Sequence, residues 1–161
     1  MRNATTTRLR CLCAAACAAP LLFGGAAGAA AATAVAPAAS PSEILQLVNA
    51  ERQKAGCQAL SENGQLTKAA QVFAEDASKN NLTNHTGSDG SSYSQRIKDA
   101  GYTGARAEAE NMAWGSTDAN TIVSGWMKSA GHHRNIVDCD FKDTGVAVSG
   151  DYAVQVFATP G

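Results

Sequence analysis

The chain has 161 residues, of which 45% are hydrophobic and 17% charged, and 13 Lys and Arg against 14 Asp and Glu give a formal net charge of −1. Such a balance, with no block of like charges, excludes the basic footprint that binding to nucleic acid or to anionic membranes requires. The length allows one domain with one hydrophobic core after the first 36 residues are set aside.

Those 36 residues have the pattern of an export signal followed by an alanine-rich spacer. Three arginines in the first ten residues precede an apolar run over residues 11–23, and small residues follow. The run is too short and too rich in alanine for a transmembrane helix, and a lipid anchor on Cys17 is not expected. We therefore expect a secreted protein whose residues 37–161 form a single domain. Losing three arginines leaves ten basic residues against fourteen acidic ones, a net charge of −4.

Apolar spacing predicts two helices at the start of this domain. The first has Ser40 as its N-cap, followed by proline at the first helical position, and it ends at Gly56. The second begins near Leu66 and ends near Asn80, with apolar residues recurring at helical spacing. The polar segment 84–92 that follows contains Asp-Gly and is predicted to be a loop.

Two further helices are predicted before the C-terminal strands. A short one follows a serine cap at residues 91–92 and ends at Gly101. Another follows a cap at residues 116–117 and is broken by Gly131, after which residues 132–136 make a further turn. Each of these helices has one apolar face that should pack inward.

The short and mixed segment 107–114 is interpreted as a strand. The runs 144–148 and 152–158 alternate apolar and polar residues and are predicted to form an antiparallel hairpin joined by three residues, 149–151. Helices first and antiparallel strands last predict an α+β domain with helices packed on the sheet. Four aromatic residues are expected in the core more than in a cage around a ligand, since each lies on an apolar helical or strand face: Phe73, Tyr93, Trp114 and Trp126.

Two cysteines, Cys57 and Cys139, remain after the signal is removed. In an exported chain such a pair is most simply a disulfide bond. The alternative, a thiol nucleophile or a zinc ligand, lacks the close Cys-x-x-Cys pair that zinc sites usually contain.

Three residues, His85, Glu110 and His132, could carry chemistry if the fold brings them together. Two neutral imidazoles and a carboxylate form a common open zinc set, and the same groups could instead exchange protons. There is no His-Glu-x-x-His motif to show that they meet, so the simpler interpretations stay open. His85 could be solvated, His132 could complement the dipole at a helix end, and Glu110 could be either exposed or buried with a partner. Ser129 precedes His132 closely, but no Gly-x-Ser-x-Gly elbow surrounds it.

An ordered series of short motifs lies between residues 82 and 157, in a pattern that extends over roughly residues 42–158. It comprises Leu82-x-x-His85-Thr86, Asp89-Gly90-Ser91, Ala100-Gly101-Tyr102, Glu110-Asn111-Met112-Ala113, Trp126-Met127-x-Ser129-x-Gly131-His132, Gly145-Val146-Ala147 and Tyr152-Ala153-Val154-Gln155-Val156-Phe157. This series resembles the bacterial branch of the CAP superfamily, which is named after cysteine-rich secretory proteins, antigen 5 and pathogenesis-related-one proteins.

The resemblance implies an α-β-α sandwich with a small antiparallel sheet between helical layers. It also implies a cleft in which His85 is the first histidine, Glu110 the glutamate and His132 the second histidine. Where eukaryotic members have a second glutamate, this chain has Ser129, so the set of four is incomplete. His133 is an additional histidine without an implied role.

Members of this superfamily are mostly secreted or surface proteins; some bind lipids and some bind zinc or magnesium. We therefore expect a protein that binds an extracellular small molecule, lipid or cell-wall component without turnover. The alternative is a metal-dependent hydrolase, in which His85 and His132 hold zinc or another divalent cation and Glu110 is a ligand or general base. A purely structural surface module is the third possibility, and the sequence carries no signal of the oligomeric state.

Overall fold

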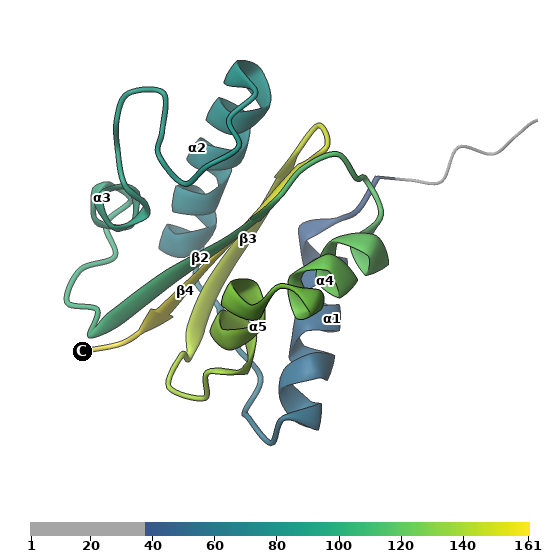
Figure 1. The fold of residues 1–161 in the computed structure, drawn as a ribbon. Coiled ribbons are helices and arrows are strands. Elements are labelled where there is room, and N and C mark those ends of the chain that lie inside the picture. Colours follow the sequence, from purple (N-terminus) through teal and green to yellow (C-terminus); the bar gives the residue numbers. More distant parts are fainter. Residues whose placement is uncertain (1–37) are drawn as a thin grey trace, which may run out of the picture. The chain divides into compact units, whose positions relative to one another are not determined.

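The structure is a computed structural model that describes residues 38–161, so the expected export signal lies outside the described residues. Within this range, five helices and four strands follow one another in the order α1, β1, α2, α3, β2, α4, α5, β3, β4. Figure 1 shows α2 and α3 on one face of the sheet and α1, α4 and α5 on the other. The predicted α+β class and α-β-α sandwich are confirmed. Within residues 38–161, no helix combines the length and apolar character that a membrane span needs.

One helical layer consists of α1 (Pro41–Lys54), α4 (Ala119–Lys128) and α5 (Ala130–Val137). Their inward residues build one half of the core, whose largest members are fully buried or nearly so. This half contains Ile44, Val48, Leu60, Ile122, Val123, Trp126, Ile136, Phe141, Val146 and Phe157. It occupies the sheet face on which the candidate residues Ser129 and His132 are carried.

The other layer consists of α2 (Gly64–Asn80) and α3 (Tyr93–Asp99). The apolar positions predicted for the second helix are all buried, and Asn81 ends that helix in the left-handed conformation with φ 53°. The second half of the core contains Leu66, Ala69, Ala70, Phe73, Ala77, Ile97, Tyr102, Met112, Val154 and Val156.

The sheet has the strand order β1-β3-β4-β2. β2 (Ala107–Ala113) and β3 (Asp143–Ser149) each pair antiparallel with the central β4 (Tyr152–Thr159). β1 (Ser61–Glu62), which the sequence analysis did not predict, pairs parallel with β3. The sheet is therefore mixed and not purely antiparallel as expected. β1 was not predicted because two residues are too few to show any alternation in the sequence.

Two expected boundaries around α4 and α5 are wrong. The N-cap of α4 is Asp118, whose carboxylate accepts from the Thr121 N–H at 2.7 Å, and residues 116–117 precede it. α4 ends at Lys128, and Gly131 lies inside α5 instead of breaking a helix. Ser129 turns the chain because its extended backbone (φ −92°, ψ 119°) separates the two helices.

Two further expectations are corrected near the end of the sheet. The hairpin turn has two residues, because Ser149 pairs with Tyr152 and belongs to β3. Trp114 is not in the core: 50% of its surface is exposed just beyond the end of β2. Its apolar neighbours in the sequence predicted burial, but the strand ends one residue before it.

The predicted disulfide between Cys57 and Cys139 is present. It closes a loop of 82 residues, which in the chain-entropy picture stabilises the fold by about 4.5 kcal/mol. The fully buried Arg52 lies beside this bridge and donates to the carbonyls of Ile136, Asp138 and Phe141 at 2.7 to 2.9 Å. Together they fix the end of α5 to the end of α1, and α5 is the helix that carries His132.

Gly145 offers a direct test of how closely α2 packs on the sheet. A Cβ at this position would overlap the backbone of Leu66 and Thr67, so Gly145→Ala should destabilise the fold by about 1–3 kcal/mol or more, as overpacking does. The measurement is urea denaturation. Gly125→Ala is the matched control, because Gly125 lies on the exposed side of α4 and a Cβ there meets nothing within 4 Å. This variant should be as stable as the unchanged protein or slightly more stable. Equal stability of both variants would contradict this packing.

Candidate functional site

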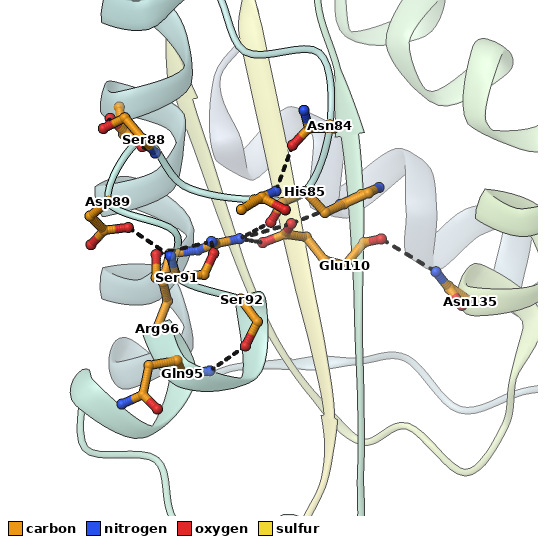
Figure 2. A network of polar contacts seen from close by, with 12 residues as sticks. Asn84, His85, Ser88, Asp89, Ser91, Ser92, Gln95, Arg96, Glu110 and Asn135 are labelled. Carbon is orange, nitrogen blue, oxygen red and sulfur yellow. Dashed lines mark hydrogen bonds and ion pairs between the residues drawn. The ribbon is translucent and has the colours of Figure 1, made fainter.

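Glu110 on β2 is a buried carboxylate with a buried partner. Its side chain is 1% exposed, and the guanidinium of Arg96 on α3 is 6% exposed. Arg96 Nη2 donates to both carboxylate oxygens, at 3.1 Å to Oε1 and 2.9 Å to Oε2 (Figure 2). Of the two possibilities that the sequence left open for Glu110, the structure shows the buried and paired one. A charge removed from water needs such a partner.

His85 contacts the same carboxylate from the loop that joins α2 and α3. Its Nδ1 lies 2.8 Å from Glu110 Oε1, while 45% of its side chain remains exposed. An ionised carboxylate only accepts hydrogen bonds, so Nδ1 is the protonated nitrogen and neutral His85 has Nε2 as its free acceptor. The imidazole thus connects the buried carboxylate with the surface.

Arg96 holds this loop as well as the carboxylate, and the sequence analysis missed it. Its Nη2 donates to the His85 carbonyl at 3.1 Å and its Nη1 to the Ser91 carbonyl at 2.9 Å. Its guanidinium carbon lies 3.7 Å from the centre of the Phe73 ring on α2, a cation–π contact. Two features of the sequence could have indicated Arg96. Glu110 stands in an apolar segment, where a buried carboxylate needs a cation as its partner, and Arg96 precedes Ile97 in a helix that packs inward.

His132 reaches the site through two asparagines that the sequence analysis did not select. Asn111 on β2 donates to the His132 carbonyl at 3.1 Å, and Asn135 donates to Asn111 Oδ1 at 2.9 Å. Asn135 also approaches the Glu110 carbonyl, at 3.5 Å. These contacts attach α5 to the outer side of the edge strand β2.

Strand alternation gives the neighbouring residues Glu110 and Asn111 different partners. Successive side chains of a strand point to opposite faces. Glu110 faces α3 and His85, whereas Asn111 faces α5 and His132. The imidazole of His132 still senses His85: burial lowers its pKa below 6.5, and the charge of His85 lowers it further. The structure therefore joins His85 to Glu110 directly, and it holds the His132 carbonyl through Asn111 while the His132 imidazole interacts electrostatically with His85.

A groove of about 300 Å³ opens beside His132. It lies between the end of β2 and the outer surface of α4. Its lining includes both tryptophans and the predicted residue Ser129, and it consists of Met112, Ala113, Trp114, Ser116, Thr121, Ile122, Gly125, Trp126, Ser129 and His132. His85 and Glu110 lie outside this lining, so the groove is adjacent to the ion pair and not centred on it.

The expected metal site would need His85, His132 and Glu110 as donors, and Glu110 does not fit the role of a direct ligand. Its oxygens already accept from Arg96 and His85, and a cation would face the guanidinium charge. Within residues 38–161, no three His, Cys, Asp or Glu side chains gather as a metal-binding group. Glu110 fits the role of orienting the His85 ring, which leaves two imidazoles as candidate donors.

Residues 45–159 match the family model described as the cysteine-rich secretory protein family, CAP. The match covers well over half of the chain, and the chain belongs to this family. The resemblance proposed from the motifs is thereby confirmed.

Two curated relatives from Bacillus subtilis support the assignment. The uncharacterized protein YkwD is 32% identical over 117 residues, which cover 71% of this chain and 45% of that protein. The uncharacterized membrane protein YlbC is 30% identical over 118 residues, 73% of this chain and 34% of that protein. The chain thus spans about a third to somewhat under half of the length of the curated relatives it matches.

Solved structures share the fold. An extracellular SCP-domain protein from Bacillus anthracis matches 73% of this chain and 39% of its own, with TM-score 0.69 and 25% identity. An outer surface protein from Borrelia burgdorferi matches 74% of this chain and 92% of its own, with TM-score 0.67 and 21% identity. The first is described as an extracellular protein and the second as an outer surface protein, and the location of this chain stays a prediction.

Removing the carboxylate should destabilise the protein strongly. In Glu110→Ala the guanidinium of Arg96 stays buried without its partner, and a loss of about 3–5 kcal/mol in the free energy of unfolding is expected. The double variant Glu110→Ala with Arg96→Met should recover part of this loss, because both charges are absent. Urea denaturation of the unchanged protein, of Glu110→Ala, of Arg96→Met and of the double variant gives the coupling. A change within about 0.5 kcal/mol for Glu110→Ala would contradict its burial.

The lowered pKa of His132 predicts a pH dependence of stability. Below pH 6.5 the unfolded chain binds a proton at residue 132 before the folded chain does, so stability is lost as pH falls from about 6.5 to the lower folded pKa. His132→Asn should flatten this part of the profile. In NMR titrations His132 should titrate below pH 6.5, and His85→Ala should raise its pKa. An unchanged value in His85→Ala would show that the two imidazoles do not interact.

Proposed function

We propose that this secreted CAP-domain protein is a binding module that holds an extracellular lipid or cell-wall component and does not turn it over. The observation that carries the proposal is the groove beside Ser129 and His132, which is built from aromatic walls and a few polar groups. Such a composition is typical of ligand sites in proteins. The fold and family give the scaffold, and the groove gives the place where a ligand would bind.

The contacts around Glu110 and Ser129 favour binding over catalysis. A general base needs a free carboxylate within reach of a substrate, whereas Glu110 is buried and held by Arg96. Ser129 has no hydrogen bond to His132 among the described residues, and its hydroxyl makes no capping bond to α5. An activated serine would have a base as its partner, so this hydroxyl is better suited to bind a ligand.

Turnover assays test the absence of catalysis. With model peptides and esters, with and without added zinc, the rate should equal that of the variant carrying both His85→Ala and His132→Ala. A rate that disappears in the double variant would contradict the proposal. Binding is measured with the same protein by adding neutral lipid vesicles or soluble wall saccharides and following the amide signals of Ser129 and His132. If neither ligand class shifts these signals, the proposed binding function is contradicted, and the purely structural surface module is the possibility that is left.

The metal-dependent hydrolase is kept as the second candidate because the charge of His85 reaches His132. In that candidate the two imidazoles hold the cation, and a bound metal would supply a polarised water. Calorimetric titration of zinc separates the candidates: binding tighter than about 1 mM that is lost in the double histidine variant favours the hydrolase. The binding module requires no such affinity.

A further inference from the structure

Trp114 is a large aromatic side chain that the fold holds at the surface. In the described part of the chain, Trp114 and Val72 are the large hydrophobic residues that are about half exposed, at 50% and 52%. Trp114 follows directly on β2, and the next residue, Gly115, adopts φ +80°. The Gly115 N–H donates to Asp151 Oδ2 at 3.1 Å, which ties this segment to the turn of the β3–β4 hairpin. The indole therefore lies on a fixed support.

The groove beside this indole combines a bare wall with hydroxyl groups. Trp126 closes the inner side, and its own indole N–H is used by the Met112 carbonyl at 3.1 Å. Gly125 adds no side chain, and nothing lies within 4 Å of its missing Cβ, so the surface of α4 stays open. Three hydroxyl side chains stand around this wall, Ser116, Thr121 and Ser129.

The lining contains no Asp, Glu, Lys or Arg, and its titratable residue, His132, is uncharged at neutral pH because burial lowers its pKa below 6.5. A site for a fatty-acid carboxylate or a phosphate group would present a cation or a cluster of free N–H groups. A site for a cationic ligand would present a carboxylate. The absence of both in this groove selects an uncharged ligand, and the hydroxyls select one that is rich in hydrogen-bonding groups.

The shape and size of the groove narrow the ligand class further. A volume of about 300 Å³ is at the lower end of small-molecule sites, which suits one or two rings and not an extended acyl chain. A pyranose ring has a face of C–H groups that can lie on an indole and a rim of hydroxyls that need polar partners. The exposed Trp114 and the surrounding Ser and Thr side chains provide these two surfaces together.

We propose that this groove binds a sugar ring of a neutral saccharide, stacked on Trp114, with its hydroxyls bonded to Ser129 and Thr121. The inference rests on the proposed binding function and names the ligand class for that site. It assigns Trp114 the role of binding residue, and Asp151 the role of positioning it through Gly115.

The test titrates the whole mature protein with two neutral tetrasaccharides, cellotetraose and tetra-N-acetylchitotetraose, and with phosphatidylcholine vesicles. NMR signals of the Trp114 indole N–H and the Ser129 amide report binding. At least one tetrasaccharide should shift both signals. Trp114→Ala should weaken the affinity about tenfold or more, as truncation of a central aromatic residue does, while Trp114→Phe should stay within about threefold. Val72→Ala, on α2 in the opposite layer, is the matched control and should bind as the unchanged protein does.

The outcomes separate this inference from the proposed function. If vesicles shift the Ser129 signal and neither saccharide does, the sugar class is wrong and the binding module stands. If no ligand shifts either signal, both proposals fail. If a saccharide binds equally well to Trp114→Ala, with melting temperatures unchanged, binding does not involve this groove and the inference is overturned.

Discussion

The buried charge of Glu110 is the constraint on which the site depends. A carboxylate on the edge strand β2 is stable inside the protein only if a cation is buried with it, and Arg96 supplies this cation from α3. Arg96 also lies against Phe73 of α2 and holds the carbonyls of His85 and Ser91. One guanidinium thus fixes the strand, two helices and the histidine loop relative to one another.

The edge strand divides the candidate site into two parts with different chemistry. On one side Glu110 orients His85, and the carboxylate is fully engaged. On the other side Asn111 holds the backbone of His132, and the groove with its tryptophans opens beside that residue. In the polar part both carboxylate oxygens have partners, although the buried Arg96 Nε has no hydrogen bond within the described residues, whereas the groove is open. On this distribution rests the proposal that a ligand binds in the groove and that the ion pair supports it.

The relatives share this scaffold at low sequence identity. Structural neighbours at 21 to 25% identity superpose with TM-scores of 0.67 to 0.69, and each aligns with about three quarters of this chain. The curated relatives are more than twice as long as the segment they share with it. A common core that persists in proteins of different length is consistent with function that resides in sites on the fold and not in the fold itself. For this chain, the proposal assigns such a role to the exposed Trp114 and to the hydroxyl of Ser129.

The sequence by itself determined most of the helices, the hairpin strands, the disulfide and the family, because these depend on local spacing, on the residues at helix ends and on a pair of cysteines in an exported chain. The second helix shows this best, since every predicted apolar position is buried. The short parallel β1 and the cap of α4 were missed, because two residues show no periodicity and three neighbouring cap residues are locally equivalent.

The contacts within the candidate site join residues that are far apart in the sequence. His85, Glu110 and His132 could be selected from residue type and motif order, but the partner Arg96 and the exposure of Trp114 could not. Only the tertiary structure decided these two features: Glu110 takes its cation from α3, the helix that packs beside it, and Trp114 is exposed because β2 ends one residue before it.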